Sequence, residues 1–315
     1  MSAPLDVIVL GCGAIGVTTA VVLQEAGHRV RIWARDEPPN TTSSVAAAFW
    51  YPYRVHPAER VAAWARQSFD DFAALATSAP DAGVVRRPAL ELLARPGAPS
   101  WAAALPSFRP AHPDELPAGH RAGVVFDSFV VETPRYLPWL RRRFLAAGGV
   151  IERRVLDRPD DALAAADAVV HCAGLGARAL APDPAVYPVR GQLLRVANPG
   201  LDRVIVDEES GPITYIVPRQ GDVILGGTSD EGATDLTPDP AAGAAILARC
   251  VALEPRLRGV TILGALVGLR PCRPEVRLER DLAAPRPLVH NYGHGGAGIT
   301  LSWGCAREAA ALLLA

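Results

Sequence analysis

Three glycines near the start of the chain have a spacing that suits the binding of a pyrophosphate. Gly11, Gly13 and Gly16 form the pattern G-x-G-x-x-G. In such a loop the first glycine permits a tight turn, the second lets the backbone approach a pyrophosphate, and the third lets a helix pack closely on a strand. The N-terminus of the following helix also stabilises negative charge. The pattern predicts a dinucleotide site, and both NAD and FAD satisfy it.

The segments around these glycines have the patterns of the elements that such a site needs. Residues 6–10 are an apolar run rich in β-branched residues, which is typical of a buried strand. Residues 17–26 predict a helix ending at Gly27, and residues 29–33 predict a second strand. A helical crossover between two strands implies a parallel pair. We therefore expect an α/β sheet that carries the glycine loop at its edge.

The residue that contacts the adenosine ribose is not fixed by the pattern. The second predicted strand leads into IWARDEPP, so Arg35 and Asp36 are both candidates for this contact. A solvated charge pair in a turn accounts for either residue equally well. The two candidates stay open.

The rest of the chain predicts a second sheet with helices around it. Residues 57–77 have a helical pattern, whereas residues 80–117 are crowded with proline and glycine, which favours loops and short edge strands. Residues 187–227 contain four strand-like segments separated by turn residues, which predicts a mixed or antiparallel sheet. Because the nucleotide-type segments are separated along the chain, we predict two interleaved domains. They are a dinucleotide-binding domain (residues 1–52, 150–186 and 265–315) and a substrate-binding domain (residues 53–149 and 187–264).

Composition excludes several classes of function. The 315 residues carry a net charge of −1, so we expect neither a nucleic-acid partner nor an anionic membrane surface. No apolar run reaches the ~18 residues of a membrane span, and the first residues resemble a strand more than a signal peptide. The five cysteines include no C-x-x-C pair, which argues against a disulfide framework and a zinc site. We expect a cytoplasmic protein with no metal.

Several separated motifs resemble the D-amino acid oxidase family. They occur in the family's order over nearly the whole chain, and the last two are far more specific than a glycine loop. The related D-aspartate and glycine oxidases share much of this pattern. The motifs are the glycine loop, TTSSVAAAFWYPY from Thr41, PVRGQ from Pro188, TYIVP from Thr214, GLRPCRPEVRLER from Gly268 and HNYGHGGAGITLSWGCA from His290.

The resemblance implies a fold, a cofactor and a reaction. The implied fold is α/β, with a Rossmann-like FAD-binding domain interleaved with a mixed-sheet substrate-binding domain. The implied reaction is oxidative deamination of a D-amino acid by hydride transfer from the α-carbon to flavin N5. Its products are a 2-oxo acid, ammonia and hydrogen peroxide, with O2 as electron acceptor. The active site is expected between the flavin ring and the sheet of the substrate domain.

The resemblance also assigns the residues that hold the substrate. Arg270 matches the arginine that binds the α-carboxylate, a task for which the planar guanidinium suits two parallel hydrogen bonds. Arg273 and Arg277 lie nearby at strand-like spacing and compete for this role. Tyr215 matches the tyrosine whose hydroxyl meets the same carboxylate.

Three further positions follow from the same resemblance. The Gly296 carbonyl is expected to accept a hydrogen bond from the substrate amine, and Tyr51 to point toward the substrate side chain. His294 is expected to be structural, because hydride transfer needs no general base. Gly211 stands where eukaryotic members carry a second tyrosine, so a tyrosine-bearing lid is expected to be absent.

The loop pattern and the resemblance together give a set of cofactor contacts. For the residues outside the glycine loop and the C-terminal glycine segment, loop polarity or core packing is nearly as good an explanation. The set comprises Gly11, Gly13, Ala14, Ile15, Gly16, Arg35, Asp36, Thr41, Thr42, Ser43, Ala48, Phe49, Val155, Gly295, Gly296, Gly298, Ile299 and Thr300.

The sequence leaves the substrate and the assembly less defined. D-Aspartate would require a further cation in the side-chain pocket, whereas Tyr51 and Phe49 are uncharged, which favours neutral or hydrophobic D-amino acids. A D-aspartate oxidase and a glycine or sarcosine oxidase are the enzymatic alternatives. An NAD(P)-dependent dehydrogenase and a catalytically silent flavin-binding protein are the others. A homodimer is one possible assembly.

Overall fold

The computed structural model describes residues 3–99 and 101–314. The strands are β1 (Asp6–Leu10), β2 (Arg29–Ala34), β3 (Val84–Leu93), β4 (Phe108–Pro110), β5 (Ala122–Val131), β6 (Val150–Arg153), β7 (Ala168–His171), β8 (Tyr187–Val196), β9 (Val204–Asp207), β10 (Thr214–Pro218), β11 (Val223–Gly226), β12 (Asp230–Glu231), β13 (Ile262–Arg280) and β14 (Leu288–His294). The α-helices are α1 (Ala14–Glu25), α2 (Ala58–Ser78), α3 (Thr133–Ala146), α4 (Asp160–Ala165), α5 (Ala177–Leu180), α6 (Pro240–Leu253) and α7 (Gly298–Leu314). The short 3-10 helices are η1 (Thr42–Val45), η2 (Pro80–Ala82), η3 (Ala102–Ala104), η4 (Pro113–Glu115), η5 (Gly174–Gly176), η6 (Pro255–Leu257) and η7 (Gly295–Ala297).

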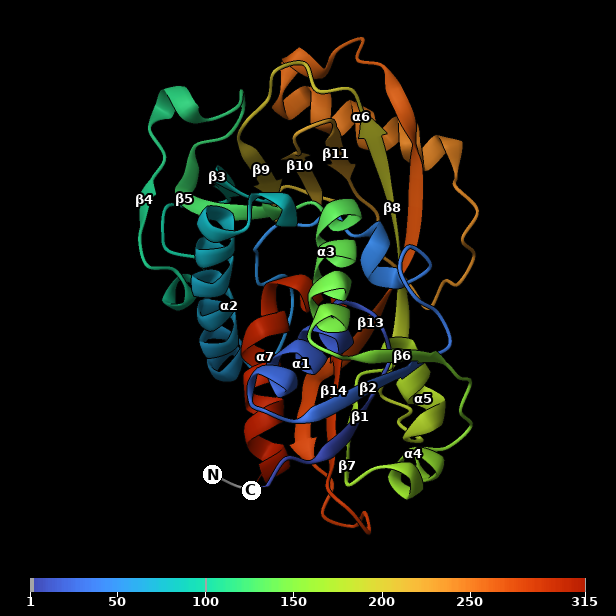
Figure 1. Ribbon diagram of the computed structural model, residues 1–315. Helices are drawn as coiled ribbons and strands as arrows, with labels where there is room; N and C mark the ends of the chain where they lie inside the picture. Colours follow the sequence, from blue (N-terminus) through green and yellow to red (C-terminus); the bar gives the residue numbers. More distant parts are fainter. Residues whose placement is uncertain (1–2, 100, 315) are drawn as a thin grey trace.

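The strands form one mixed sheet in the order β4-β5-β3-β9-β10-β11-β8-β13-β14-β7-β1-β2-β6, with β12 paired to β8. The long strand β13 connects the two parts of this sheet. Its first half pairs antiparallel with β8, and its second half pairs antiparallel with β14. In Figure 1 it runs from the upper part of the molecule, beside β8, down to β14. The predicted α/β fold class is confirmed.

The strands around the glycine loop are parallel. They lie in the order β6-β2-β1-β7-β14, which is the order of nucleotide-binding α/β sheets. Alternate residues of β1 face opposite sides. Val7 and Val9 belong to the core shared with α1 and α7, whereas Ile8 and Leu10 pack with α4. Figure 1 shows α1, α3 and α7 grouped on one side of these strands and α4 and α5 on another. Helices therefore bury both faces.

The second part of the sheet is mixed, which agrees with the prediction of a mixed or antiparallel sheet. Strands β9, β10, β11 and β8 pair antiparallel in that order, whereas β3 pairs parallel with β9. Helix α6 covers this part through Ile246, Cys250 and Leu253, which pack against Leu225 and Val196. The side of this sheet away from α6 is thereby left to face the site.

The prediction for residues 80–117 was partly wrong. Strand β3 is ten residues long and lies inside the sheet, paired with β5 and β9. Pro88 is tolerated there because the pairing with β9 begins one residue later, at Ala89. The missing N–H therefore falls where the strand has only one neighbour. Strand β5 was not predicted.

The boundaries between the two predicted domains stay a prediction. The boundary at residue 265 falls inside β13, which is one continuous strand of the sheet. Within residues 3–99 and 101–314, no helix combines the length and the apolar character that a membrane crossing needs. The same residues hold no cluster of three or more His, Cys, Asp or Glu side chains suited to a metal ion.

Candidate active site

A cavity of about 730 Å³ connects the glycine loop to the antiparallel sheet. At one end it is lined by the start of α1, and at the other by β10 and β13. Of the site residues predicted from the sequence, all except Gly16 line this cavity. The structure therefore brings together segments that are more than two hundred residues apart in the chain. The individual roles of these residues stay predictions.

The glycine loop is as tight as its pattern requires. Gly11 has a φ of +107°, and a Cβ there would lie 2.6 Å from the Cys172 carbonyl oxygen. A Cβ on Gly16 would lie 1.9 Å from the carbonyl oxygen of Gly11. Gly16 therefore does not line the cavity but lets α1 pack directly on the loop. This is the packing role of the third glycine in a dinucleotide loop.

The N-terminus of α1 is open toward an anionic ligand. Gly13 is its N-cap and supplies no side-chain hydrogen bond. Ser43 Oγ accepts from the Ala14 amide at 3.0 Å and so places η1 beside this helix end. Thr41 and Thr42 add two more hydroxyl groups that line the same part of the cavity. Free amides, hydroxyls and a helix N-terminus are the groups that bind a pyrophosphate, so this end fits FAD.

The two candidates for the ribose contact lie side by side. Arg35 and Asp36 both line the cavity, and Arg35 Nε lies 2.7 Å from Asp36 Oδ2. The Arg35 side chain is 74% exposed, so water screens this pair. Which of the two meets the ribose stays open.

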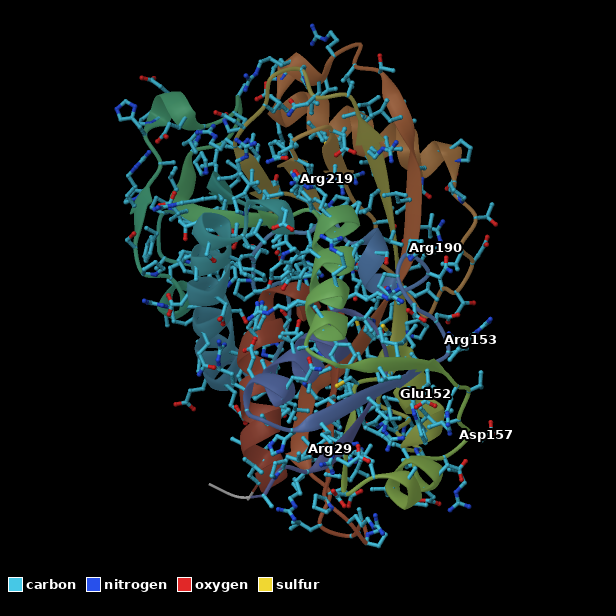
Figure 2. All side chains as sticks on the ribbon, in the orientation of Figure 1. Arg29, Glu152, Arg153, Asp157, Arg190 and Arg219 are labelled. Carbon is cyan, nitrogen blue, oxygen red and sulfur yellow. The ribbon has the colours of Figure 1, made fainter. Side chains whose placement is uncertain are left out.

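Arg270 projects into the other end of the cavity. Its Nη1 donates to the Thr228 carbonyl at 3.1 Å and lies 3.5 Å from the carbonyl of Arg190. Figure 2 marks Arg190 on β8, the strand beside β13. No carboxylate in the described part of the chain forms an ion pair with Arg270, whereas Arg273 pairs with Asp183. A half-buried guanidinium without an anionic partner among the described residues is suited to bind a carboxylate ligand.

The other two arginines considered from the sequence form ion pairs with carboxylates outside the cavity. Arg273 Nε lies 3.0 Å from Asp183, and Arg277 Nε lies 2.7 Å from Glu279. Neither is among the residues that line the cavity. Of the three arginines considered from the sequence, only Arg270 is in position to meet a substrate.

Tyr215 lies beside Arg270 in a space that a glycine provides. It pairs with Gly226 across β10 and β11, and a Cβ on Gly226 would lie 2.0 Å from the Tyr215 ring. Burial raises the pKa of Tyr215, although the nearby Arg270 guanidinium acts in the opposite direction. The hydroxyl therefore stays protonated and can donate a hydrogen bond to a carboxylate.

Tyr51 is held from two sides. Its backbone N–H donates to Thr300 Oγ1 at 3.0 Å, which ties it to α7. Its hydroxyl donates to Glu91 Oε1 at 2.7 Å. Phe49 stacks on the Tyr51 ring with centroids 5.5 Å apart, and both rings line the cavity. The Tyr51 ring thus forms a fixed wall of the substrate end.

Tyr53 is a site residue that sequence reasoning missed. It lines the cavity, and a Cβ on Gly296 would lie 2.7 Å from its ring. Its buried hydroxyl has no hydrogen-bond partner among the described residues. The spacing of Tyr51 and Tyr53 in YPY is the signal that could have found it, because alternate residues of an extended segment share a face.

The glycine segment between β14 and α7 closes the cavity. Gly295 and Gly296 lie in η7, and Gly298 begins α7. Burial lowers the pKa of the neighbouring His294 to about 3, so this imidazole is neutral near pH 7. A neutral, fully buried histidine agrees with the structural role expected for it.

Gly191 provides the space for the Arg270 guanidinium and allows a first test. A Cβ at Gly191 would lie 2.6 Å from this group, so we expect Gly191→Ala to displace it and weaken carboxylate binding. KM for an amino acid should rise by about tenfold or more, because one good charge-assisted contact is worth at least ~1.4 kcal/mol. Steady-state kinetics with measured FAD content checks this. Gly221→Ala, which meets no atom within 4 Å, is the matched control. An unchanged KM in Gly191→Ala would contradict the prediction.

Comparison with known proteins places this arrangement in a family. The family described as FAD dependent oxidoreductase matches residues 6–312. The chain is 53% identical over 309 residues to a protein of Rubrobacter xylanophilus named D-amino-acid oxidase, covering 97% of this chain and 94% of that protein. It is 49% identical over 314 residues to a protein of the same name from Streptomyces coelicolor, covering 98% and 96%.

A solved structure extends the likeness to the fold. Glycine oxidase from Geobacillus kaustophilus matches with a TM-score of 0.81 and 21% identity, covering 99% of this chain and 95% of that one. At this identity the match supports a shared fold and nothing further. The family match over residues 6–312 and the two full-length relatives show the family, and the cavity fits its cofactor. The chain belongs to the D-amino acid oxidase family of FAD-dependent oxidoreductases.

Proposed function

We propose that the protein oxidises D-amino acids with FAD as cofactor and O2 as electron acceptor, forming 2-oxo acids, ammonia and hydrogen peroxide. One observation carries the proposal. The unpaired guanidinium of Arg270 and the hydroxyl of Tyr215 lie at the far end of a cavity that begins with a dinucleotide loop. The names of the full-length relatives support the same reaction.

The chain's own residues bind and orient the substrate. Arg270 and Tyr215 hold the α-carboxylate by charge-assisted hydrogen bonds. The Gly296 carbonyl accepts a hydrogen bond from the neutral amine. These three contacts fix the α-carbon in one orientation, so that only one enantiomer presents its α-hydrogen to the cofactor. FAD, when bound, supplies the two-electron chemistry by accepting hydride at N5 and passing the electrons to O2.

Among the described residues that line this end of the cavity, no side chain is set up to remove a proton from carbon. His294 is buried and neutral, and Tyr215 is protonated. The protein's contribution is therefore positioning and electrostatics, which alone supply a large part of the rate in such sites.

The walls of the substrate end favour neutral, hydrophobic side chains along most of their length. Leu193, Val206, Ile213 and Phe49 line this region and offer apolar surface. The other arginines that line the cavity, Arg35 and Arg154, lie with the first strands of the parallel sheet and not beside Arg270. D-Aspartate therefore lacks a second cation for its side chain, which argues against the D-aspartate oxidase alternative.

Anaerobic mixing of the purified protein with D-alanine and with L-alanine tests the proposal. We expect the visible absorption of the bound flavin to bleach with the D-form only, and to return with release of peroxide when air is admitted. Bleaching by glycine or sarcosine, but not by D-alanine, would favour the glycine oxidase alternative. A colourless protein that cannot be reconstituted with FAD would contradict the proposal and favour a nicotinamide-dependent dehydrogenase. A yellow protein that no amino acid bleaches would indicate a silent flavin-binding protein.

The assembly and the cellular location are proposals from the sequence alone. We propose a cytoplasmic location, on the grounds of the reduced cysteines expected from the sequence, and a homodimer as the assembly.

A further inference from the structure

A glutamate lies in the same row of the sheet as the residues that line the substrate end. The register aligns Glu91 of β3 with Val206 of β9, Tyr215 of β10, Gly226 of β11 and Leu193 of β8. Side chains in register across neighbouring strands share one face of a sheet. Val206, Tyr215 and Leu193 line the cavity, so the Glu91 side chain is on the face that borders it.

This glutamate and a second one have unmet hydrogen-bonding capacity. Glu91 is 7% exposed, and its Oε1 accepts from the Tyr51 hydroxyl at 2.7 Å. Its Oε2 is buried and has no partner in the described part of the chain, and the same is true of Glu208 Oε1. Glu208 Oε2 lies 3.5 Å from Arg54 Nε, but the Arg54 side chain is 61% exposed and water screens this pair.

Tyr51 connects these carboxylates to the cavity. Its ring lines the substrate end, and its protonated hydroxyl contacts Glu91. The hydrogen bonds that act on the pKa of Tyr51 come from both Glu91 and Glu208, so the two carboxyl groups converge on one hydroxyl. The Tyr51 hydroxyl and the Trp101 side chain are too few donors for the oxygens of two carboxylates, and buried carboxylate oxygens without donors are costly. A ligand that brings N–H donors and positive charge would remove this deficit.

Neither glutamate lines the cavity itself, and Tyr51, which does, contacts Glu91 through its hydroxyl. We propose that Glu91 and Glu208 form an anionic region behind the Tyr51 wall of the substrate side-chain pocket, which favours D-amino acids with long cationic side chains, such as D-lysine and D-arginine, and disfavours acidic ones. The inference rests on the proposed oxidation of D-amino acids and names the substrate class for it. Apolar walls then hold the methylene stem of the side chain, and the carboxylates attract its charged end.

The spacing of the strands agrees with a long side chain. Glu91 and Tyr215 lie on strands separated by one strand, β9, so their backbones are about 10 Å apart. Val206 lies between them and contributes apolar surface. A substrate whose carboxylate is held at Arg270 and Tyr215 must therefore extend several bonds beyond its α-carbon to approach Glu91. Short side chains would not extend toward the anionic region.

The charge of this region depends on pH near neutrality. The pKa of Glu91 is raised to about 7, because burial and the nearby Glu208 and Glu209 outweigh the hydrogen bonds from Tyr51 and Trp101, which lower it. Burial likewise raises the pKa of Glu208. Because a raised carboxyl pKa means that the anion forms only above it, the preference for cations should be weak below about pH 7 and grow above it.

The wild-type protein provides the first test without any substitution. D-Lysine and D-norleucine have similar length and differ in charge, as do D-glutamate and D-glutamine. We expect kcat/KM for D-lysine to exceed that for D-norleucine by about tenfold, and D-glutamate to be poorer than D-glutamine by a similar factor. The lysine ratio should rise between about pH 6 and about pH 8, where the side-chain ammonium stays charged. Equal values within both pairs would overturn the inference. Absence of flavin reduction by every D-amino acid would instead overturn the proposed function.

Two substitutions assign the effect to these residues. Glu91→Gln and Glu208→Gln keep the shape and remove the charge, so each should lower the D-lysine to D-norleucine ratio several-fold. Glu209→Gln is the matched control, because it removes the same charge from an exposed neighbour, and it should leave the ratio unchanged above about pH 8, where Glu91 is ionised in either protein. A wild-type ratio in both buried variants would contradict the assignment. If either variant fails to retain FAD, the other variant and the wild-type pH series decide the question.

Discussion

Replacing Arg270 with alanine is expected to lower kcat/KM for D-alanine by roughly 30- to 5,000-fold while FAD stays bound. The guanidinium has no carboxylate partner among the described residues and reaches the substrate end of the cavity from β13. Removing one member of a buried, hydrogen-bonded charge pair costs about 2–5 kcal/mol, which corresponds to this loss. Stopped-flow reduction of the flavin, with the FAD content measured separately, gives both quantities.

Two further variants define the origin of that loss. Arg270→Lys keeps a positive charge but not the planar pair of donors, so it should recover only part of the activity. Arg273→Ala is the matched control, because Arg273 pairs with Asp183 and does not line the cavity. It should retain near-normal kinetics. Near-normal kinetics in Arg270→Ala would remove Arg270 from the site and reopen the choice among the arginines of this strand.

Replacing Gly16 with alanine is expected to yield a protein that no longer retains FAD. The new Cβ would lie 1.9 Å from the Gly11 carbonyl oxygen. The position of a Cβ is set by the backbone, and the carbonyl is itself backbone. Neither atom can rotate away, so α1 or the loop must move. A displaced helix N-terminus no longer meets the pyrophosphate. We expect the dissociation constant for FAD to rise by at least about 100-fold, which corresponds to ~2.7 kcal/mol. Titration of the apoprotein with FAD measures it.

A second glycine-to-alanine change controls for the substitution itself. Gly243 lies inside α6, where a Cβ would meet Leu194 at 3.4 Å, an ordinary contact. Alanine stabilises a helix by about 0.5–1 kcal/mol relative to glycine. The Gly243→Ala variant should therefore bind FAD normally and unfold at a slightly higher temperature. If Gly16→Ala purifies yellow with a full complement of FAD, the packing argument for this loop is wrong.

Three glycines at the substrate end leave space for the functional side chains that they face. A Cβ would collide with the Arg270 guanidinium at Gly191, with the Tyr215 ring at Gly226 and with the Tyr53 ring at Gly296. Each functional side chain can therefore keep its orientation because the residue that faces it has no side chain. Gly191 and Gly226 are strand residues and Gly296 belongs to the short helix η7, so this role becomes visible only after these elements have packed together.

Much of the fold could be predicted because local patterns agree with the final structure. Strand β1, the glycine loop and helix α2 occur where the sequence placed them. Strand β3 was missed because proline and glycine around it favour loops locally. Pairing with β5 and β9 supplies the hydrogen bonds that override this preference. A prediction from one sequence cannot see such distant partners.

The sequence by itself determined the kind of chemistry. The spacing of Gly11, Gly13 and Gly16 is a local feature that can be read directly from the sequence. Arg270 and Tyr215 are recognisable by residue type and by the motifs that contain them. Only the tertiary structure decided which arginine is free to bind a carboxylate, because ion pairing of Arg273 depends on a residue ninety positions away. It also decided that Glu91 lies on the same face of the sheet as residues that line the substrate pocket, because strand register sets which side chains share a face.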